Sequence, residues 1–468
     1  MEFDVVIGLE IHAELKTKSK VFCFCKNEFG AEPNTNTCPV CLGLPGALPV
    51  INKRAVELCI KAGLCFGSTI NDYAVMERKN YFYPDLSKAY QISQLVHPIC
   101  LGGGITLDNG EFKALNRIHL EEDAGKLNHI SKVVGTLVDY NRGGTPLIEI
   151  VTEPVFLTAE EVDEFLKKVR EALVFADIAN CKMEEGGMRC DVNLSLKPKG
   201  SSKLGTRTEM KNLNSFKSVV QAINYEIQRQ KEILSSGGAV LQETRKWDDD
   251  AGENYSMRSK EEAQDYRYFP DPDILPINIS REDVERIKKE IPMLPNERRK
   301  KYIDEYMLSK AEAELLASDK YVSDYFDECV KIYNNPKKIS NWILTELLRR
   351  VKESGENKFA ISEKELANIV KFVEDKKVTK ANGIVLIDEI VKTGKCADVL
   401  AKELNLISTI TEEQIAMLLE KFKIENPKAV KDFKTDPKVQ SFIIGYVMKN
   451  TQGKANGEVV KNLISKMF

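Results

Sequence analysis

The sequence lacks several features that would each point to a different class of protein. It has no apolar run near the ~20 residues that a membrane-spanning helix needs. Its first residues, Met-Glu-Phe-Asp, lack the basic and apolar regions of a secretory signal peptide. The three glycines at 102–104 are not followed by Lys-Ser or Lys-Thr, and no Walker A phosphate loop occurs elsewhere. These absences predict a cytoplasmic protein with no membrane contact, in which metal and basic side chains hold the phosphates of any nucleotide.

Length and composition predict a multidomain globular protein. The chain has 468 residues, 43% of them hydrophobic and 30% charged, with a net charge of −3. One hydrophobic core rarely organises that many residues, so two or three domains are expected. Strand patterns dominate before about residue 275 and amphipathic helices after it, which indicates an α+β fold. We predict three domains, at residues 1–292, 293–403 and 404–468.

Four of the eleven cysteines form a spaced set. Cys23 and Cys25 make a C-x-C pair, and twelve residues later Cys38 and Cys41 make a C-x-x-C pair. In a cytosolic chain two such pairs favour a structural four-thiolate zinc site over disulfides. The first pair has one intervening residue where zinc ribbons more often have two. The alternative is four reduced surface cysteines.

A second set of polar residues predicts a site for a divalent metal and phosphates. The segment His119-Leu120-Glu121-Glu122-Asp123 brings three adjacent carboxylates to a strand end, where they repel one another unless a cation or water lies among them. Three other segments alternate like half-buried strands and carry charges of both signs on one face. These faces hold Glu10, His12 and Glu14; Arg189, Asp191 and Asn193; and Arg207, Glu209 and Lys211. If the strands are neighbours, the groups form a charged funnel; the alternative is a solvated loop and solvated strand faces.

The remaining patterns concern helices, aromatic residues and the basic end of the chain. Thr158 is predicted to cap a helix with Glu161 closing a capping box, and another helix is predicted after Asn214. Basic and aromatic residues at 78–85 could grip a nucleotide or an RNA end, or could form the edge of a core. From Pro427 onward eight lysines stand against three acidic residues, a local charge of +5. Such an end suggests contact with a polyanion or, alternatively, a solvated helical surface.

Several long motifs resemble the GatB subunit of the aspartyl/glutamyl-tRNA amidotransferases (GatCAB), over the whole chain. They are Val6 to His12, Phe29 to Asn34, Arg78 to Asp85, His119 to Lys126, Asp139 to Thr152, Met183 to Gly186, Lys211 to Phe216, Asp265 to Pro272 and Gly453 to Asn456. Two departures occur: Gly187-Met188 stands where Ser-Leu is usual, and Gly457 stands where proline is typical. Neither changes a charged residue of the predicted site.

The resemblance implies a function that agrees with the charged funnel. Members of the family use ATP and Mg²⁺ to phosphorylate the side-chain carboxylate of glutamate or aspartate on misacylated tRNA(Gln) or tRNA(Asn). Ammonia then displaces the phosphate, giving Gln-tRNA(Gln) or Asn-tRNA(Asn). The ammonia comes from the amidase partner, GatA, and the small partner GatC braces the pair; this chain has no Ser-Ser-Lys amidase pattern of its own. The implied fold is an antiparallel-sheet cradle similar to glutamine synthetase, then a helical domain and a tRNA-binding tail.

Site residues follow from the pattern and the resemblance together. We predict Glu10, His12, Glu122 and Glu209 as catalytic magnesium ligands, with Glu121, Asp191, Glu184 and Glu185 as further candidates. Strand alternation places Glu121 on the same face as His119, and Glu122 on the opposite face with Leu120. Glu122 therefore reaches the site only if the strand ends or bulges there. Glu122 is preferred because the second glutamate is the ligand in the family. Lys79, Arg189 and Arg207 are the candidates for binding ATP phosphates.

Two functions of other classes stay open on the residues alone. One is a free-standing small-molecule ligase of the glutamine synthetase type, which needs neither RNA nor a basic tail. The other is a zinc-bearing RNA-binding scaffold without catalysis. ATP turnover stimulated by Glu-tRNA excludes both.

Overall fold

The computed structural model describes residues 2–129, 135–259, 265–407, 412–433, 437–451, 455 and 457–468. Gly453, Lys454 and Asn456 of the last motif lie outside these residues. The chain divides into two compact units, Met1–Pro295 and Asn296–Phe468. The first holds the strands and the second is helical, which confirms the predicted α+β fold. The three-domain division and the likeness to glutamine synthetase stay predictions.

A ten-stranded sheet forms the framework of the first unit. Its order is β15-β14-β13-β12-β1-β11-β8-β6-β2, with β7 also paired to β8. The first strand of the chain therefore lies inside the sheet and pairs on both sides. The strands are β1 (Phe3–Glu14), β2 (Thr69–Ile70), β6 (Cys100–Leu101), β7 (Gly104–Thr106), β8 (Phe112–Glu122), β11 (Pro146–Thr152), β12 (Met188–Pro198), β13 (Thr208–Lys211), β14 (Glu243–Asp248) and β15 (Glu253–Ser259).

Three small sheets accompany it. The first is β16 (Phe269–Pro270), β4 (Glu77–Asn80) and β5 (Tyr90–Ser93); the second is β9 (Lys126–His129) and β10 (Thr136–Asp139); the third is β17 (Ile277–Asn278) and β3 (Tyr73–Ala74). The strand, turn and strand predicted between 137 and 150 are present as β10 and β11, although they belong to different sheets.

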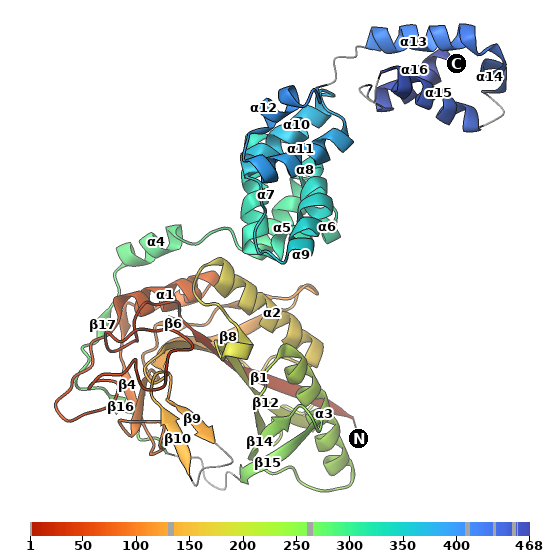
Figure 1. Cartoon of the computed structure of the whole chain (residues 1–468). Helices are drawn as coiled ribbons and strands as arrows, with labels where there is room; N and C mark the ends of the chain where they lie inside the picture. Colours follow the sequence, from red (N-terminus) through yellow and green to blue (C-terminus); the bar gives the residue numbers. More distant parts are fainter. Residues whose placement is uncertain are drawn as a thin grey trace. The chain divides into compact units, whose positions relative to one another are not determined.

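Alternation along the strands separates an apolar face from a polar one. Ile7, Leu9, Ile11, Ala13 and Leu15 of the β1 segment are almost completely buried. Helices α2 (Ala159–Phe175) and α3 (Phe216–Ser235) cover this face, as Figure 1 shows. The polar side chains of the same strands are left on the opposite face, because successive residues of a strand point to opposite sides.

The two covering helices begin where the sequence predicts. The side chain of Thr158 accepts a hydrogen bond from the Glu161 amide, and Ser215 caps α3 in the same way. The Glu161 carboxylate accepts hydrogen bonds from the Leu157 amide and Lys113 rather than from the Thr158 amide, so the predicted capping box is not formed. Helices α1 (Lys53–Cys65) and α4 (Arg281–Lys289) complete the helices of this unit, with the short turn η1 (Met183–Glu185) before β12.

A buried carboxylate joins α3 to the short strand β13. Glu226 is fully buried and accepts hydrogen bonds from Thr208 Oγ1 at 2.8 Å and from Gln230 at 2.8 Å. Arg229 supplies the opposite charge at 2.8 Å. Removing one partner of such a buried pair is costly, so this contact fixes the strand that carries Glu209.

The second unit is built of helices around two apolar clusters. One cluster includes Tyr302, Phe326, Trp342 and Leu386, and the other Leu419, Phe422 and Val460. The predicted helix at 339–351 contains a π-helical turn, η2 (Ile343–Leu347). The α-helices are α5 (Pro295–Asp304), α6 (Lys310–Ala317), α7 (Lys320–Ile332), α8 (Pro336–Trp342), α9 (Leu348–Ser354), α10 (Glu363–Glu374), α11 (Lys380–Thr393), α12 (Ala397–Glu403), α13 (Glu412–Glu425), α14 (Pro427–Asp432), α15 (Pro437–Asn450) and α16 (Gly457–Met467). Within the described residues, no helix combines the length and apolar character needed to cross a bilayer.

Candidate metal and phosphate site

The register of β1 brings polar residues from distant segments together. His12 lies opposite Glu149 of β11 on one side and opposite Arg189 of β12 on the other. Glu10 lies opposite Asp191 of β12. Side chains directly opposite each other share a face of the sheet, so these groups converge on the face that the helices leave uncovered.

The first group of potential ligands, here called the histidine cluster, consists of His12, Glu121 and Glu149. Their donor atoms all lie within 4.8 Å of one another. Nε2 of His12 is 3.4 Å from Oε1 of Glu121 and 3.7 Å from Oε2 of Glu149. On the far side, Nε2 of His119 is 3.1 Å from the same Glu149 oxygen. Two carboxylates and an imidazole from three adjacent strands therefore converge.

Burial dominates the electrostatics of the histidine cluster. It lowers the pKa of His12, and together with the charge of Glu149 it raises the pKa of Glu121. Burial alone would also raise the pKa of Glu149, but the adjacent His119 holds that pKa below its usual value. A divalent cation favours the charged form of such carboxylates and suits oxygen ligands.

The second group, here called the carboxylate cluster, consists of Glu10, Asp191 and Glu209. Its donor oxygens also lie within 4.8 Å of one another. Asn193 donates a hydrogen bond of 3.0 Å to Glu10, and the Thr244 hydroxyl donates one of 2.8 Å to Glu209. Burial raises the pKa of Glu10, and Glu149 and Asp191 add to the effect.

Lys211 lies against the carboxylate cluster. Its ammonium group forms a short ion pair with Asp191 and lies 3.1 Å from Glu209. All-oxygen donors match the preference of Mg²⁺, so the cluster fits the predicted ion in chemistry. In this conformation the neutralising charge comes from lysine.

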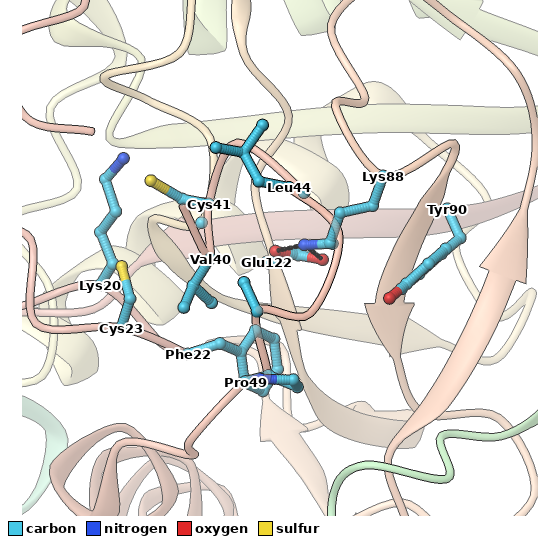
Figure 2. A pocket seen from close by; sticks show the side chains of 13 residues that line it. Lys20, Phe22, Cys23, Val40, Cys41, Leu44, Pro49, Lys88, Tyr90 and Glu122 are labelled. Carbon is cyan, nitrogen blue, oxygen red and sulfur yellow. Dashed lines mark hydrogen bonds and ion pairs between the residues drawn. The ribbon is translucent and has the colours of Figure 1, made fainter. Parts of the chain in front are cut away.

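The structure separates Glu122 from both clusters. Strand β8 keeps its register through Glu122, which pairs with Pro146, while Glu121 pairs with Leu147. The Glu122 carboxylate accepts two hydrogen bonds of 2.6 Å from Lys88 and one of 2.9 Å from the Ile92 amide. Lys88 and Glu122 line a small cavity of about 190 Å³. Figure 2 shows the two side chains facing each other there. The register thus places Glu121, not Glu122, beside His12; a ligand role for Glu122 stays a prediction that this conformation does not support.

The three predicted phosphate-binding residues have different surroundings. Arg189 pairs with Asp123 at 2.8 Å, next to Arg142, which contacts the same carboxylate. The Lys79 ammonium lies 4.9 Å from the centre of the Tyr266 ring. Its charge partly opposes the rise of the Glu121 pKa that burial and Glu149 cause, and adds to the lowering of the Glu149 pKa by the two histidines. Arg207 is exposed and precedes β13, which begins at Thr208 rather than at 205 as predicted. Of these three residues, Lys79 therefore has the strongest electrostatic effect on the two carboxylates of the histidine cluster.

Glu184 and Glu185 belong to a neighbouring cleft. They form the turn η1, and Glu185 pairs with Lys182 at 2.8 Å. With Arg142 and Arg189 they line a cleft of about 860 Å³ at the end of β1. The structure does not bring either carboxylate into the two ligand clusters.

The four spaced cysteines converge. The sulfur atoms of Cys23, Cys25, Cys38 and Cys41 lie within 4.8 Å of one another, and those of Cys38 and Cys41 are 3.9 Å apart. A tetrahedral zinc ion with Zn–S bonds of ~2.3 Å holds its sulfurs roughly 3.8 Å apart, so this arrangement fits. The Cys38 amide also points to the Cys41 sulfur at 3.1 Å, and the Cys23 thiol and Lys20 contribute to lowering the pKa of Cys41 to about 4.

Three residues of the site are absent from the set that the sequence predicts. Glu149 falls in a predicted hairpin, although it is the one carboxylate in the apolar strand Pro146–Thr152. Asp123 appears only as one of an acidic triplet, and Lys211 only as one charge on a strand face. The isolated charge within an apolar strand is the available signal for Glu149; the other two need knowledge of their pairing partners.

Comparison with known proteins identifies the family. A family model described as the GatB/GatE catalytic domain matches residues 5–285, and one described as the GatB domain matches residues 324–468. The chain belongs to the GatB family. It is 49% identical to the GatB subunit of the aspartyl/glutamyl-tRNA(Asn/Gln) amidotransferase from Caldicellulosiruptor bescii, over 99% of this chain and 98% of the relative. It is 44% identical to the protein of that name from Thermoanaerobacter pseudethanolicus, over 100% and 99%, and 45% identical to that of Clostridium botulinum, over 100% and 99%.

Membership of the GatB family confirms the predicted resemblance and the enzyme class. The matched catalytic domain contains both ligand clusters and the four cysteines. The second match lies within the helical unit. The roles of individual residues stay predictions, since the family match assigns none of them.

Proposed function

We propose that this chain activates the side-chain carboxylate of glutamate or aspartate on misacylated tRNA with ATP, for amidation by ammonia. The observation that carries the proposal is the pair of ligand clusters at Glu10 and His12, two alternate residues of β1 on the face of the sheet opposite helices α2 and α3. Phosphoryl transfer needs concentrated positive charge and exact placement of the reactants, rather than covalent catalysis by the protein. The names of the three relatives support the substrate class.

The proposed chemistry has two steps. A carboxylate oxygen of the aminoacyl group attacks the γ-phosphorus of ATP, ADP leaves, and an acyl phosphate forms. Ammonia then attacks the acyl carbon and the carbon–oxygen bond to phosphate breaks, leaving the amide and inorganic phosphate after loss of a proton. The first step is needed because a free carboxylate has no adequate leaving group.

The side chains divide this task between them. Glu10, Asp191 and Glu209 on one side, and His12, Glu121 and Glu149 on the other, would hold the magnesium ions. Bound magnesium neutralises phosphate oxygens and orients them for in-line transfer. Lys79 lies where it can attract the negative reactants, and the pairing of Arg189 with Asp123, which Arg142 also contacts, keeps the Arg189 guanidinium at the edge of the site.

The cysteine cluster would hold one structural zinc ion. Four thiolates leave no open coordination position for a substrate, so the ion supplies stability to the segment between β1 and α1. Lys20, which lies near Cys41, would offset part of the negative charge of the four thiolates.

The partners also belong to this proposal. The amidase GatA would supply the ammonia, the small protein GatC would brace the GatCAB heterotrimer, and the lysine-rich end of the chain would contact the tRNA. The cytoplasmic location predicted from the sequence agrees with a role in translation.

A single assay tests the proposal. The chain, purified with its amidase and small partners, should release ADP from ATP when Glu-tRNA(Gln) or Asp-tRNA(Asn) is added, and only slowly with uncharged tRNA. Free glutamate should not replace the charged tRNA. Equal turnover with free glutamate would favour the free-standing ligase, and no turnover with any substrate would favour the RNA-binding scaffold.

A further inference from the structure

We propose that Lys211 is a resident counter-cation of the carboxylate cluster. A divalent ion must displace it in order to bind there, and the displaced ammonium then binds a phosphate group of the nucleotide. This inference rests on the proposed function and adds to it an order in which metal and nucleotide bind.

The contacts of Lys211 carry the first part of the argument. Its ammonium group contacts two of the three carboxylates, Asp191 and Glu209, and the donor oxygen of the third, Glu10, lies within 4.8 Å of theirs. Asn193 and Thr244 orient Glu10 and Glu209 from the neighbouring positions. The three acidic groups are therefore assembled around a cation that the chain itself supplies.

The histidine cluster differs in this respect. The ion pairs of Glu121 and Glu149 are formed with His12 and His119. A neutral imidazole can serve directly as a metal ligand, whereas an ammonium group has no lone pair to offer. A first divalent ion can thus enter the histidine cluster without displacing a charged side chain.

Once a divalent ion displaces it, the Lys211 ammonium group can move to the nucleotide. An ammonium group and a divalent ion within about 4 Å of each other repel strongly at the edge of a protein. The Lys211 side chain is 39% exposed, and its flexible stem allows the ammonium group to leave the cluster. The negative charge of an incoming nucleotide would stabilise both the lysine in its new position and the second ion.

Titration of the full zinc-loaded chain with Mn²⁺, followed by electron paramagnetic resonance, tests this order without tRNA. The wild-type chain should bind one ion tightly and a second weakly in the absence of nucleotide. Lys211→Met should tighten the second site by at least about tenfold, because the competing charge has gone. Lys246→Met is the matched control, since Lys246 is exposed and lies opposite Lys211 on β14, outside the cluster.

A second measurement separates this role from a structural one. With Mn²⁺ saturating, Lys211→Met should bind the non-hydrolysable analogue AMP-PNP more weakly, while it binds Mn²⁺ alone more tightly. A residue needed only for folding would weaken both. Unchanged Mn²⁺ binding in Lys211→Met, or equal effects in Lys246→Met, would overturn the proposal.

The wild-type conformation can be tested even if Lys211→Met does not fold. Since lysine occupies the carboxylate cluster, Asp191→Asn should leave the tight Mn²⁺ site intact without nucleotide; loss of a tightly bound ion would refute the inference. Failure of charged tRNA to stimulate ATP turnover would instead refute the proposed function, and the two failures are distinct because these titrations contain no tRNA.

Discussion

Exchanging each of two adjacent glutamates for glutamine should have opposite consequences. Glu121 points to His12, whereas Glu122 points away to Lys88. We expect Glu121→Gln to reduce tRNA-dependent ADP release by ~10²-fold or more, which corresponds to about 2.7 kcal/mol of transition-state stabilisation. Its stability should change little without metal, because burial raises the pKa of Glu121 and an amide resembles the protonated acid.

Glu122→Gln should act mainly on stability. The side chains of Glu122 and Lys88 are only 5% and 15% exposed, so the substitution leaves a largely buried ammonium group without its counter-charge. Glutamine can still accept the hydrogen bond of the Ile92 amide. We therefore expect a loss of about 3 kcal/mol in the free energy of unfolding, at the lower end for breaking a buried ion pair.

Urea unfolding and an ADP-release assay separate the two effects. The chain has two tryptophans, Trp247 in the first unit and Trp342 in the second. In a Trp342→Phe background the fluorescence of Trp247 reports the first unit alone. The reasoning fails if Glu122→Gln abolishes ADP release without loss of stability while Glu121→Gln stays active.

Three further predictions concern zinc, catalysis and RNA binding. Purified protein should contain about one zinc ion per chain. Cys38→Ser or Cys41→Ser should lose the zinc and lower the melting temperature, whereas Cys396→Ser, at an exposed cysteine, should do neither. Full zinc occupancy in the Cys38 and Cys41 variants would show that these cysteines are not zinc ligands. Glu10→Gln should reduce ADP release ~10²-fold or more with tRNA affinity, measured by filter binding, nearly unchanged; near-normal turnover would remove it from the site. Removing residues 404–468 should weaken tRNA binding and flatten its salt dependence. The shortened chain forms fewer lysine–phosphate contacts, so its binding releases fewer counterions. An affinity and a salt slope equal to those of the full chain would contradict this prediction.

The framework of the site is predictable from the sequence because strand alternation is a local property. Alternation places Glu10 and His12 on the polar side of one strand, and β1 confirms it. It also places Glu121 on the side of His119, and β8 keeps that parity. The prediction of Glu122 gives the family resemblance precedence over strand alternation, whereas the structure follows strand alternation and places Glu121 beside His12.

What the sequence leaves open depends on which strands are neighbours. The contact between His12 and Glu149 joins residues more than a hundred positions apart, and nothing local specifies it. Arg207 is predicted to lie within a strand, but β13 begins one residue later, at Thr208, and Arg207 is exposed. Lys211 is visible in the sequence as a charge, but its position against Asp191 requires the pairing of β12 with β13.

Because β1 lies inside the sheet, it can pair only after its two partner strands, which come later in the chain, have been synthesised. Its partners, β11 and β12, lie between Pro146 and Pro198, so during synthesis the strand waits for well over a hundred further residues. Until then both of its edges present unpaired backbone groups that can pair with other chains. Fragments that end before Met188 should therefore aggregate when expressed, whereas a fragment that reaches Pro295 carries every strand of the sheet; comparing the soluble yields of the two would test this.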